Sequence, residues 1–261
     1  MKRFLSLTVL TLLGQLSVAN ASALSEQKLG QILSHPDRPT ADSRRDAARL
    51  PAKIMAFSGV AADDHVLDLF AGGGWYSELF SRAVGKNGKV YVQNDEVIWR
   101  FAEEGLKART KDARLSNLTR FDGVAIADMT IPDNSVDIAF MALNYHDLFF
   151  TDTVRDGKTQ QLRDEVVDYK SALAAVKKAM KDGAVFIIID HFAKPGSGYA
   201  AANTLHRIDP DIIRFQMDDM GFKLVEEAFY LRNPEDDLGK TVFDTSVRGK
   251  TDRFIYKFAK K

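Results

Sequence analysis

Two apolar stretches of the chain end in residues that can accept, donate or hold a proton. Stretch 136–143 is followed by Asn144, Tyr145, His146 and Asp147, and stretch 184–189 is followed by Asp190 and His191. A histidine beside a carboxylate is a common general base, because the carboxylate orients the ring and stabilises its protonated form. A single histidine is more often structural, but an acidic neighbour at a strand end favours function. We therefore expect chemistry at His146 and Asp147, with Tyr145 and His191 beside them.

The stretch 66–80 is the one that must bring these strand ends together around a ligand. It reads as a buried strand that contains Asp68, a turn of three glycines at 72–74, and a helix with apolar residues at helical spacing. Glycine lets a ligand approach the backbone, and the helix that follows points free N–H groups toward it. In an open α/β sheet, ligands bind at this edge, beyond the carboxyl ends of the strands.

Two classes of ligand suit such a turn. A dinucleotide site has the pattern G-x-G-x-x-G; here Gly72 and Gly74 supply the first pair, but Ser77 stands in the third place. The order Asp68, Phe70, Gly72, Gly74 instead resembles the D-x-F-x-G-x-G version of motif I in the class I S-adenosylmethionine-dependent methyltransferases. A nicotinamide-dependent oxidoreductase is therefore the weaker interpretation.

A second phrase strengthens this resemblance. Residues 131–137, Ile-Pro-Asp-Asn-Ser-Val-Asp, are similar to the L-P-x-D-x-S-x-D phrase before the fourth strand of small-molecule methyltransferases. The resemblance implies a Rossmann-like, doubly wound sheet of seven mostly parallel strands, with an antiparallel last strand and helices on both faces. The apolar pattern places strands at 66–69, 89–95, 117–121, 136–143, 184–189, 222–230 and 253–258. Long helices are expected from 96, over 162–180 and from 210 to the stop at Gly221.

The resemblance also implies how S-adenosylmethionine would bind. The glycines would admit the methionine portion, Asp68 would fix its amino end, and Trp75 or Tyr76 would face the sulfonium. Asn94 or Asp95 would hold the ribose, although either residue could instead cap the next helix. Asp122 or Asp128 would meet the adenine, with the local pattern favouring Asp128. The expected cofactor-binding residues are Asp68, Phe70, Ala71, Gly72, Gly73, Gly74, Trp75, Asn94, Asp95, Asp128 and Asn144.

In such a protein the reaction is displacement of the sulfonium methyl group by an acceptor oxygen or nitrogen. The leaving group is already activated, so positioning matters most. His146 would take the acceptor's proton. Asp147, Asp190 and His191 are also placed to hold a divalent ion, as in catechol-type methyltransferases, but that ligand set is incomplete. We therefore expect no metal.

The first 23 residues have the layout of a secretory signal peptide. Lys2 and Arg3 precede an apolar run over 4–13, and small residues at 19–23 offer cleavage sites. The run is too short for a comfortable membrane span, so no stable span is expected after cleavage. The absence of cysteine suits an oxidising compartment, and we expect a periplasmic protein.

Composition argues against a nucleic-acid partner. The 261-residue chain has 36 basic and 36 acidic residues, and removal of 1–23 takes away two of the basic ones. The slightly acidic remainder lacks the basic excess of a nucleic-acid-binding protein, which leaves a small-molecule acceptor. The length suits one α/β domain, 59–261, preceded by a helical extension over 24–58. The charged stretch 35–46 is either a solvated connector or a lid over the ligand.

The signal peptide, the stretch 35–46, the glycine turn, the Asn-x-His-Asp strand end and the phrase Leu205–Pro210 together resemble exported bacterial predicted methyltransferases. We therefore expect methyl transfer to an oxygen or nitrogen of a small-molecule or envelope acceptor. An exported binding module that kept the fold and lost catalysis is the alternative, because S-adenosylmethionine is made in the cytosol.

Overall fold

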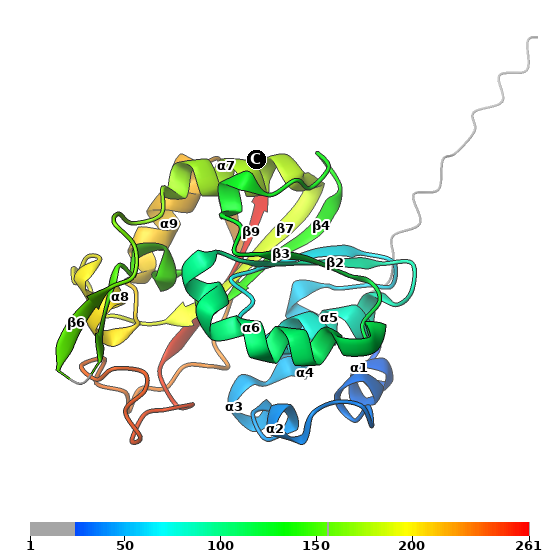
Figure 1. Cartoon of the computed structure of the whole chain (residues 1–261), viewed down its shortest axis with the longest axis horizontal. Coiled ribbons are helices and arrows are strands. Elements are labelled where there is room, and N and C mark those ends of the chain that lie inside the picture. Colours follow the sequence, from blue (N-terminus) through cyan, green and yellow to red (C-terminus); the bar gives the residue numbers. More distant parts are fainter. Residues whose placement is uncertain (1–23, 156, 261) are drawn as a thin grey trace, which may run out of the picture.

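A seven-stranded sheet forms the centre of the protein (Figure 1). The structure is a computed structural model that describes residues 24–155 and 157–260. The predicted signal peptide lies outside these residues. The strand order is β3-β2-β1-β4-β7-β9-β8, and every strand runs parallel to β1 except β9. The bounds are β1 His65–Leu69, β2 Lys89–Asn94, β3 Leu118–Asp122, β4 Val136–Ala142, β7 Met180–His191, β8 Phe222–Ala228 and β9 Arg253–Lys260. The predicted doubly wound fold with an antiparallel last strand is confirmed.

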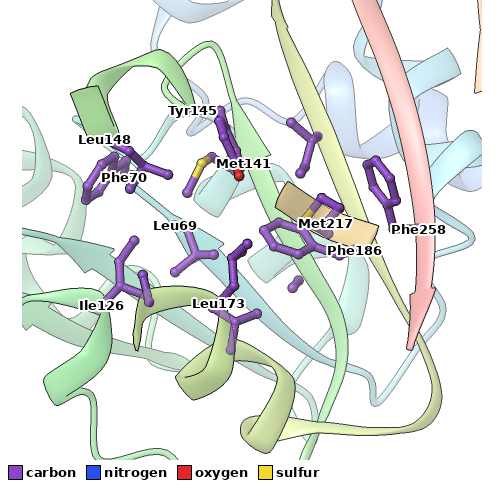
Figure 2. Packing of buried hydrophobic residues seen from close by; sticks show 14 of the residues in the cluster. Leu69, Phe70, Ile126, Met141, Tyr145, Leu148, Leu173, Phe186, Met217 and Phe258 are labelled. Atoms are coloured by element: carbon purple, nitrogen blue, oxygen red, sulfur yellow. The ribbon is translucent and has the colours of Figure 1, made fainter. Parts of the chain in front are cut away.

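Helices cover both faces of this sheet because the central strands are apolar on both sides. On one face, α7 (Tyr169–Ala179) and α9 (Pro210–Asp219) place Leu173 and Met217 against Leu69, Met141 and Phe186, the packing that Figure 2 shows. The other face is covered by α1 (Glu26–Leu33), α4 (Pro51–Ser58) and α5 (Trp75–Val84). The helix α6 (Glu96–Thr110) contributes to both clusters, through Ile98 and Leu106.

The strand order reverses between β1 and β4, which pair in parallel with Leu69 opposite Met141. Chain that leaves β1 therefore turns to one face of the sheet, and chain that leaves β4 turns to the other. Such a reversal opens a binding place beyond the carboxyl ends of the two strands. The glycine turn follows β1 and the Asn144–Asp147 segment follows β4, so both border this place.

The predicted helix over 162–180 is wrong at its start. It begins only at Tyr169, after the N-cap Asp168, and a hairpin of β5 (Asp152–Arg155) and β6 (Lys158–Gln161) precedes it. The backbone N–H groups of Leu162 and Val167 donate to the carbonyls of Thr151 and Leu148, so this segment lies against the chain that leaves β4. The apolar residues at 162–167 have the spacing of a helix, but the segment is not helical.

The N-terminal extension folds into four helices, α1, α2 (Thr40–Ser43), α3 (Asp46–Arg49) and α4, which lie beside α5 in Figure 1. The chain also contains α8 (Ala200–Leu205) and three short 3₁₀ turns, η1 (Lys111–Ala113), η2 (Ile126–Asp128) and η3 (His146–Phe149). No helix in 24–155 or 157–260 has the length and apolar character needed to cross a membrane.

Candidate active site

The glycine turn leaves open space at one of its three glycines. Gly72 and Gly74 have positive φ angles of 57° and 77°, which L side chains rarely adopt. A Cβ on Gly74 would meet Leu106 at 2.9 Å, and one on Gly73 would lie 3.7 Å from Gly105, so these two glycines allow α6 to pack closely. A Cβ on Gly72 would meet nothing within 4 Å. Gly72 is therefore the residue of this turn beside which a ligand can fit.

Phe70 occupies the place of the first glycine of motif I and shows why a glycine is common there. Its φ is 46°, in the left-handed region, yet its side chain is fully buried in the cluster of Figure 2. The left-handed conformation costs a side-chain-bearing residue about 1 kcal/mol, whereas burial of a phenylalanine gains about 2 kcal/mol. The departure from the glycine pattern thus strengthens the core.

Side chains at the end of β2 hold the glycine turn in place. Asn94, which is fully buried, accepts from the Gly72 N–H at 2.8 Å and donates to the Gly72 carbonyl at 3.2 Å. Gln93 accepts from the Phe70 N–H at 3.1 Å. Both atoms of the Asn94 amide are engaged with the turn, so the structure gives Asn94 a positioning role in place of the expected contact with a ribose.

Asp95 is the better placed of the two candidates for a ribose. Its Oδ1 caps α6 by accepting from the Ile98 N–H, and its Oδ2 pairs with Arg163 Nη1 at 2.8 Å. The Nε and Nη2 atoms of Arg163 are buried without a hydrogen-bond partner in the described part of the chain. Unpartnered buried donors cost free energy, and the acceptor oxygens or nitrogens of a nucleoside would satisfy them.

Asp122, the last residue of β3, and the later Asp128 both lie at the surface. Asp122 pairs with Arg120, whereas the exposed Asp128 ends the η2 turn without an ion pair among the described residues. Of these two candidates for the adenine, Asp128 has the freer carboxylate.

Asp68 is buried beneath the turn, and its carboxylate forms no ion pair with any residue that the structure describes. Its Oδ2 accepts from the Ser77 hydroxyl at 2.6 Å, at the start of α5. Burial raises the pKa of Asp68 to about 7, although hydrogen bonds from Ser77 and the charge of Arg49 act in the opposite direction. Ser77, which stands where a dinucleotide fold has its third glycine, is thus the partner of the motif I acid.

His146 lies between two carboxylates after β4. Its Nδ1 is 2.9 Å from Asp190 Oδ1, and its Nε2 is 3.3 Å from Asp147 Oδ1. Burial alone would lower the pKa of His146, but Asp190 and Asp147 outweigh it and raise the pKa to about 9. Asn144 donates to Asp147 Oδ2 at 2.6 Å and orients that carboxylate, whose pKa burial raises.

His206, which was not among the expected site residues, joins this group from the end of α8. Its Nδ1 is 3.9 Å from Asp147 Oδ1, and its ring meets the ring of His146 edge-on with centroids 5.4 Å apart. Burial and the neighbouring His146 lower the pKa of His206 to about 4, so its imidazole is neutral at neutral pH. One ligand atom from each of His146, Asp147 and His206 lies within 4.8 Å of the other two.

The other expected catalytic residues take different places. His191 lies one residue beyond Asp190, and its Nδ1 is 2.6 Å from the Thr251 hydroxyl. Burial lowers its pKa well below the usual value, and the charges of His146 and Arg253 add to this effect. Tyr145 is a core residue: its hydroxyl donates to Gln216, and burial raises its pKa (Figure 2). We do not retain Tyr145 as catalytic.

The N-terminal extension is fastened to the glycine turn by Arg109. This guanidinium donates to the Gly73 carbonyl at 2.8 Å, to Asp42 of the extension at 2.7 Å and to Glu78 of α5. Burial opposes ionisation of Glu78, but Arg114, Arg82 and Arg109 lower its pKa to about 2. Within the charged stretch 35–46, Arg38 is paired with Asp46. The extension is therefore packed against the turn.

Trp75, expected to face a sulfonium, is covered by the extension. Its Nε1 donates to the Asp42 carbonyl at 3.2 Å, and the guanidinium of Arg49 lies 4.8 Å from its ring centroid. Arg49 also lies 5.7 Å from the ring of Tyr76. These cation–π contacts already occupy the two aromatic side chains, so the structure does not favour Trp75 as a contact for the sulfonium.

We call Gly72, Asp95, His146 and Asp147 the strand-end site, since they follow the carboxyl ends of β1, β2 and β4. Two surface hollows elsewhere, of 330 and 470 Å³, include none of these residues in their walls. The first lies beside Phe192 and Arg232, and the second beside Lys177 and Lys260. Neither brings together groups suited to the chemistry of the strand-end site.

Comparison with solved structures identifies the fold of this chain. No protein-family model and no curated protein matches the sequence. A solved S-adenosylmethionine-dependent methyltransferase from Aquifex aeolicus has a TM-score of 0.54 and 21% identity, over 85% of this chain and 98% of the other. The chain has the fold of the class I methyltransferases.

Two further structures with this methyltransferase fold differ in what their names describe. Geranyl diphosphate C-methyltransferase from Streptomyces coelicolor, a complex with Mg²⁺, geranyl diphosphate and S-adenosylhomocysteine, has a TM-score of 0.55 at 11% identity, over 88% of this chain and 89% of its own. The cyclase SpnF has a TM-score of 0.50 at 13% identity, over 82% of this chain and 81% of its own. The chemistry must therefore be argued from the strand-end site.

Proposed function

We propose that this protein transfers the methyl group of S-adenosylmethionine to an oxygen or nitrogen of a small-molecule or envelope acceptor. One observation carries the proposal. In a methyltransferase fold, at the reversal of strand order, open space beside Gly72 follows β1 while His146, held by Asp190, follows β4. A cofactor and an acceptor bound at these two strand ends would be neighbours, and such proximity supplies most of the catalysis in methyl transfer.

Some residues of the strand-end site would bind the cofactor, and others would contact the acceptor. The methionine portion of the cofactor would lie along the backbone at 70–74, above Asp68. The ribose would meet Asp95 and Arg163. The Nε and Nη2 atoms of Arg163 have no hydrogen-bond partner among the described residues, which favours a polar ligand at this end. Asp128 is the candidate for the adenine.

On the acceptor side, Asn144 orients Asp147 and Asp190 orients His146. Asp147 would receive the acceptor's proton as the bond to the methyl carbon forms and the carbon–sulfur bond breaks, because His146, with a pKa of about 9, already holds its own proton at neutral pH. His191, neutral and partnered by Thr251, would border the acceptor.

We further propose that the protein acts in the periplasm after removal of residues 1–23. The basic start, the apolar run over 4–13 and the small residues at 19–23 support this proposal. N-terminal sequencing of protein recovered from a periplasmic fraction should read Leu24 first. An intact Met1 on protein that stays in the cytosol would contradict export.

The binding step can be tested with a matched pair of glycine variants. Gly72 and Gly59 both have positive φ angles, 57° and 77°, and a Cβ on either would meet nothing within 4 Å. Gly72→Ala and Gly59→Ala should therefore carry the same backbone strain, about 1 kcal/mol. Only Gly72→Ala should weaken S-adenosylmethionine binding in calorimetry, because only Gly72 borders the proposed cofactor. Equal affinities for the two variants would contradict the placement, and heat on titration with NAD but not with S-adenosylmethionine would indicate an oxidoreductase.

A further inference from the structure

His146, Asp147 and His206 have the composition of a metal site. Two imidazoles and one carboxylate, with further positions left open, form a common ligand set for divalent zinc and iron. His146 Nε2 and Asp147 Oδ1 are 3.3 Å apart, and His206 Nδ1 is 3.9 Å from the same oxygen. Ligand atoms at 2.0–2.2 Å from a tetrahedral ion lie about 3.4 Å from one another. The separation between Asp147 and His206 exceeds this spacing by about 0.5 Å, and all three ligand atoms lie within 4.8 Å of one another.

The surroundings of these three side chains are also those of a metal site. Histidine ligands usually donate their second ring N–H to a carboxylate, which fixes the ring and leaves the other nitrogen for the ion. Asp190 is the carboxylate that would accept from His146 Nδ1, at 2.9 Å, and Asn144 donates to the outer oxygen of Asp147 at 2.6 Å. The atoms left for an ion are His146 Nε2 and Asp147 Oδ1, which are 3.3 Å apart.

A simple ion pair between His146 and Asp147 accounts less well for this arrangement. A charge-assisted hydrogen bond from an imidazolium to a carboxylate is about 2.7–2.9 Å long, whereas the Nε2–Oδ1 distance is 3.3 Å. Asp147 and Asp190 are 5% and 0% exposed, so two carboxylates are buried around one imidazole. A divalent ion with neutral imidazole ligands would balance both charges.

The backbone at His206 gives an independent indication. His206 is the C-cap of α8 with φ 54° and ψ 49°, a left-handed conformation that costs a residue other than glycine about 1–2 kcal/mol. Its ring is held by Phe150 and Phe243, with centroids 4.6 and 4.7 Å away. Strain of this kind is kept where it places a functional side chain. Here it places an imidazole against Asp147.

We propose that His146 Nε2, Asp147 Oδ1 and His206 Nδ1 bind one divalent transition-metal ion of the zinc or iron type. This site differs from the set Asp147, Asp190 and His191 considered from sequence: Asp190 becomes the partner of a ligand, and His206 replaces His191. All three ligands come from this chain, so the ion should bind in the absence of S-adenosylmethionine and of an acceptor. One consequence rests on the proposed function: the bound ion would hold the acceptor's oxygen or nitrogen and lower its pKa, so that the acceptor would lose its proton to solvent in place of proton uptake by Asp147.

The test is calorimetric titration of the metal-free protein with Zn²⁺, in the absence of S-adenosylmethionine. His206→Phe keeps an aromatic ring between Phe150 and Phe243 but removes the nitrogen ligand. His35→Ala removes a histidine of the extension, whose side chain is 38% exposed, and is the matched control. We expect one Zn²⁺ per chain for the wild-type protein and His35→Ala, and a loss of that site in His206→Phe. Asp190→Asn, which alters only the partner of a ligand, should weaken binding about 10- to 100-fold.

Cobalt supplies a readout of the ligand set. The Co²⁺-loaded wild-type protein should show the visible absorption of a site with nitrogen and oxygen ligands, and His206→Phe should lose it. Absence of a stoichiometric Zn²⁺ site in the wild-type protein, or equal Zn²⁺ affinity in His206→Phe, would overturn the proposal. Neither measurement involves the cofactor, so a failed metal site and a failed methyltransferase are distinguishable. A protein that binds Zn²⁺ but not S-adenosylmethionine would keep this site and lose the proposed function.

Discussion

Asp68 should make the protein less stable as the pH rises through neutrality. The carboxyl group is buried, accepts from the Ser77 hydroxyl, and has a pKa of about 7 compared with 3.8 for the ordinary group. The folded state therefore holds this proton more tightly than the unfolded chain does. Between pH 3.8 and about 7 the folded protein binds more protons, so its free energy of unfolding falls as the pH rises.

The size of this effect follows from the pKa difference. About three pH units at about 1.4 kcal/mol each give a loss of about 4 kcal/mol, complete above pH 7. Asp68→Asn removes the titrating group, while its side-chain oxygen can still accept from Ser77. The variant should match the wild-type protein near pH 4 and be the more stable of the two at pH 8.

Urea unfolding at pH 4 and pH 8, followed by circular dichroism, measures this difference. The control is Asp182→Asn, because the Asp182 side chain is 99% exposed and its substitution should change stability equally at both pH values. A difference between Asp68→Asn and the wild-type protein that stays constant with pH would refute the reasoning. Under the proposed function the ionised Asp68 has a use, since it would face the amino end of the cofactor.

Two further substitutions test the packing around the glycine turn. Phe70→Gly relieves a left-handed backbone, worth about 1 kcal/mol, but removes a buried ring worth about 3–5 kcal/mol, so urea unfolding should show a net loss of about 2–4 kcal/mol. A glycine variant as stable as the wild-type protein would contradict this balance. Arg109→Met removes a buried partner of Asp42 and Glu78 and should cost about 3 kcal/mol, whereas Arg100→Met, which breaks an exposed pair, should cost less than about 0.5 kcal/mol. Equal thermal stability of these two arginine variants would show that Arg109 does not fasten the extension.

The sheet could be predicted from sequence because its signals are local. Apolar runs such as 184–189 can be little other than buried strands, and the turn at 72–74 marks the passage from strand to helix. The cap and stop residues Asp209 and Gly221 bounded α9 correctly. Residues 162–167 were misassigned to a helix because their hydrogen bonds go to residues before the hairpin, and no local pattern reveals such partners.

The candidate site was predicted less completely, for the same physical reason. Position along a strand indicated His146 and Asp147, since strand ends meet at one edge of the sheet. The choice between Asn94 and Asp95 for the ribose stayed open from sequence, because the pattern cannot show that the Asn94 amide turns back to Gly72. His206 is 59 residues away from Asp147 along the chain and reaches it only through the left-handed end of α8. The single signal available was a histidine directly before Arg207, in a phrase without a strand or helix pattern.

The proposed function requires that the strand-end site binds S-adenosylmethionine or its product. A crystal structure of the protein grown with S-adenosylhomocysteine tests this claim directly. We predict density for the nucleoside along the backbone at Gly72, with its ribose at Asp95 and its sulfur toward His146. Saturated crystals with no density there, or with the nucleoside bound elsewhere on the protein, would contradict the account.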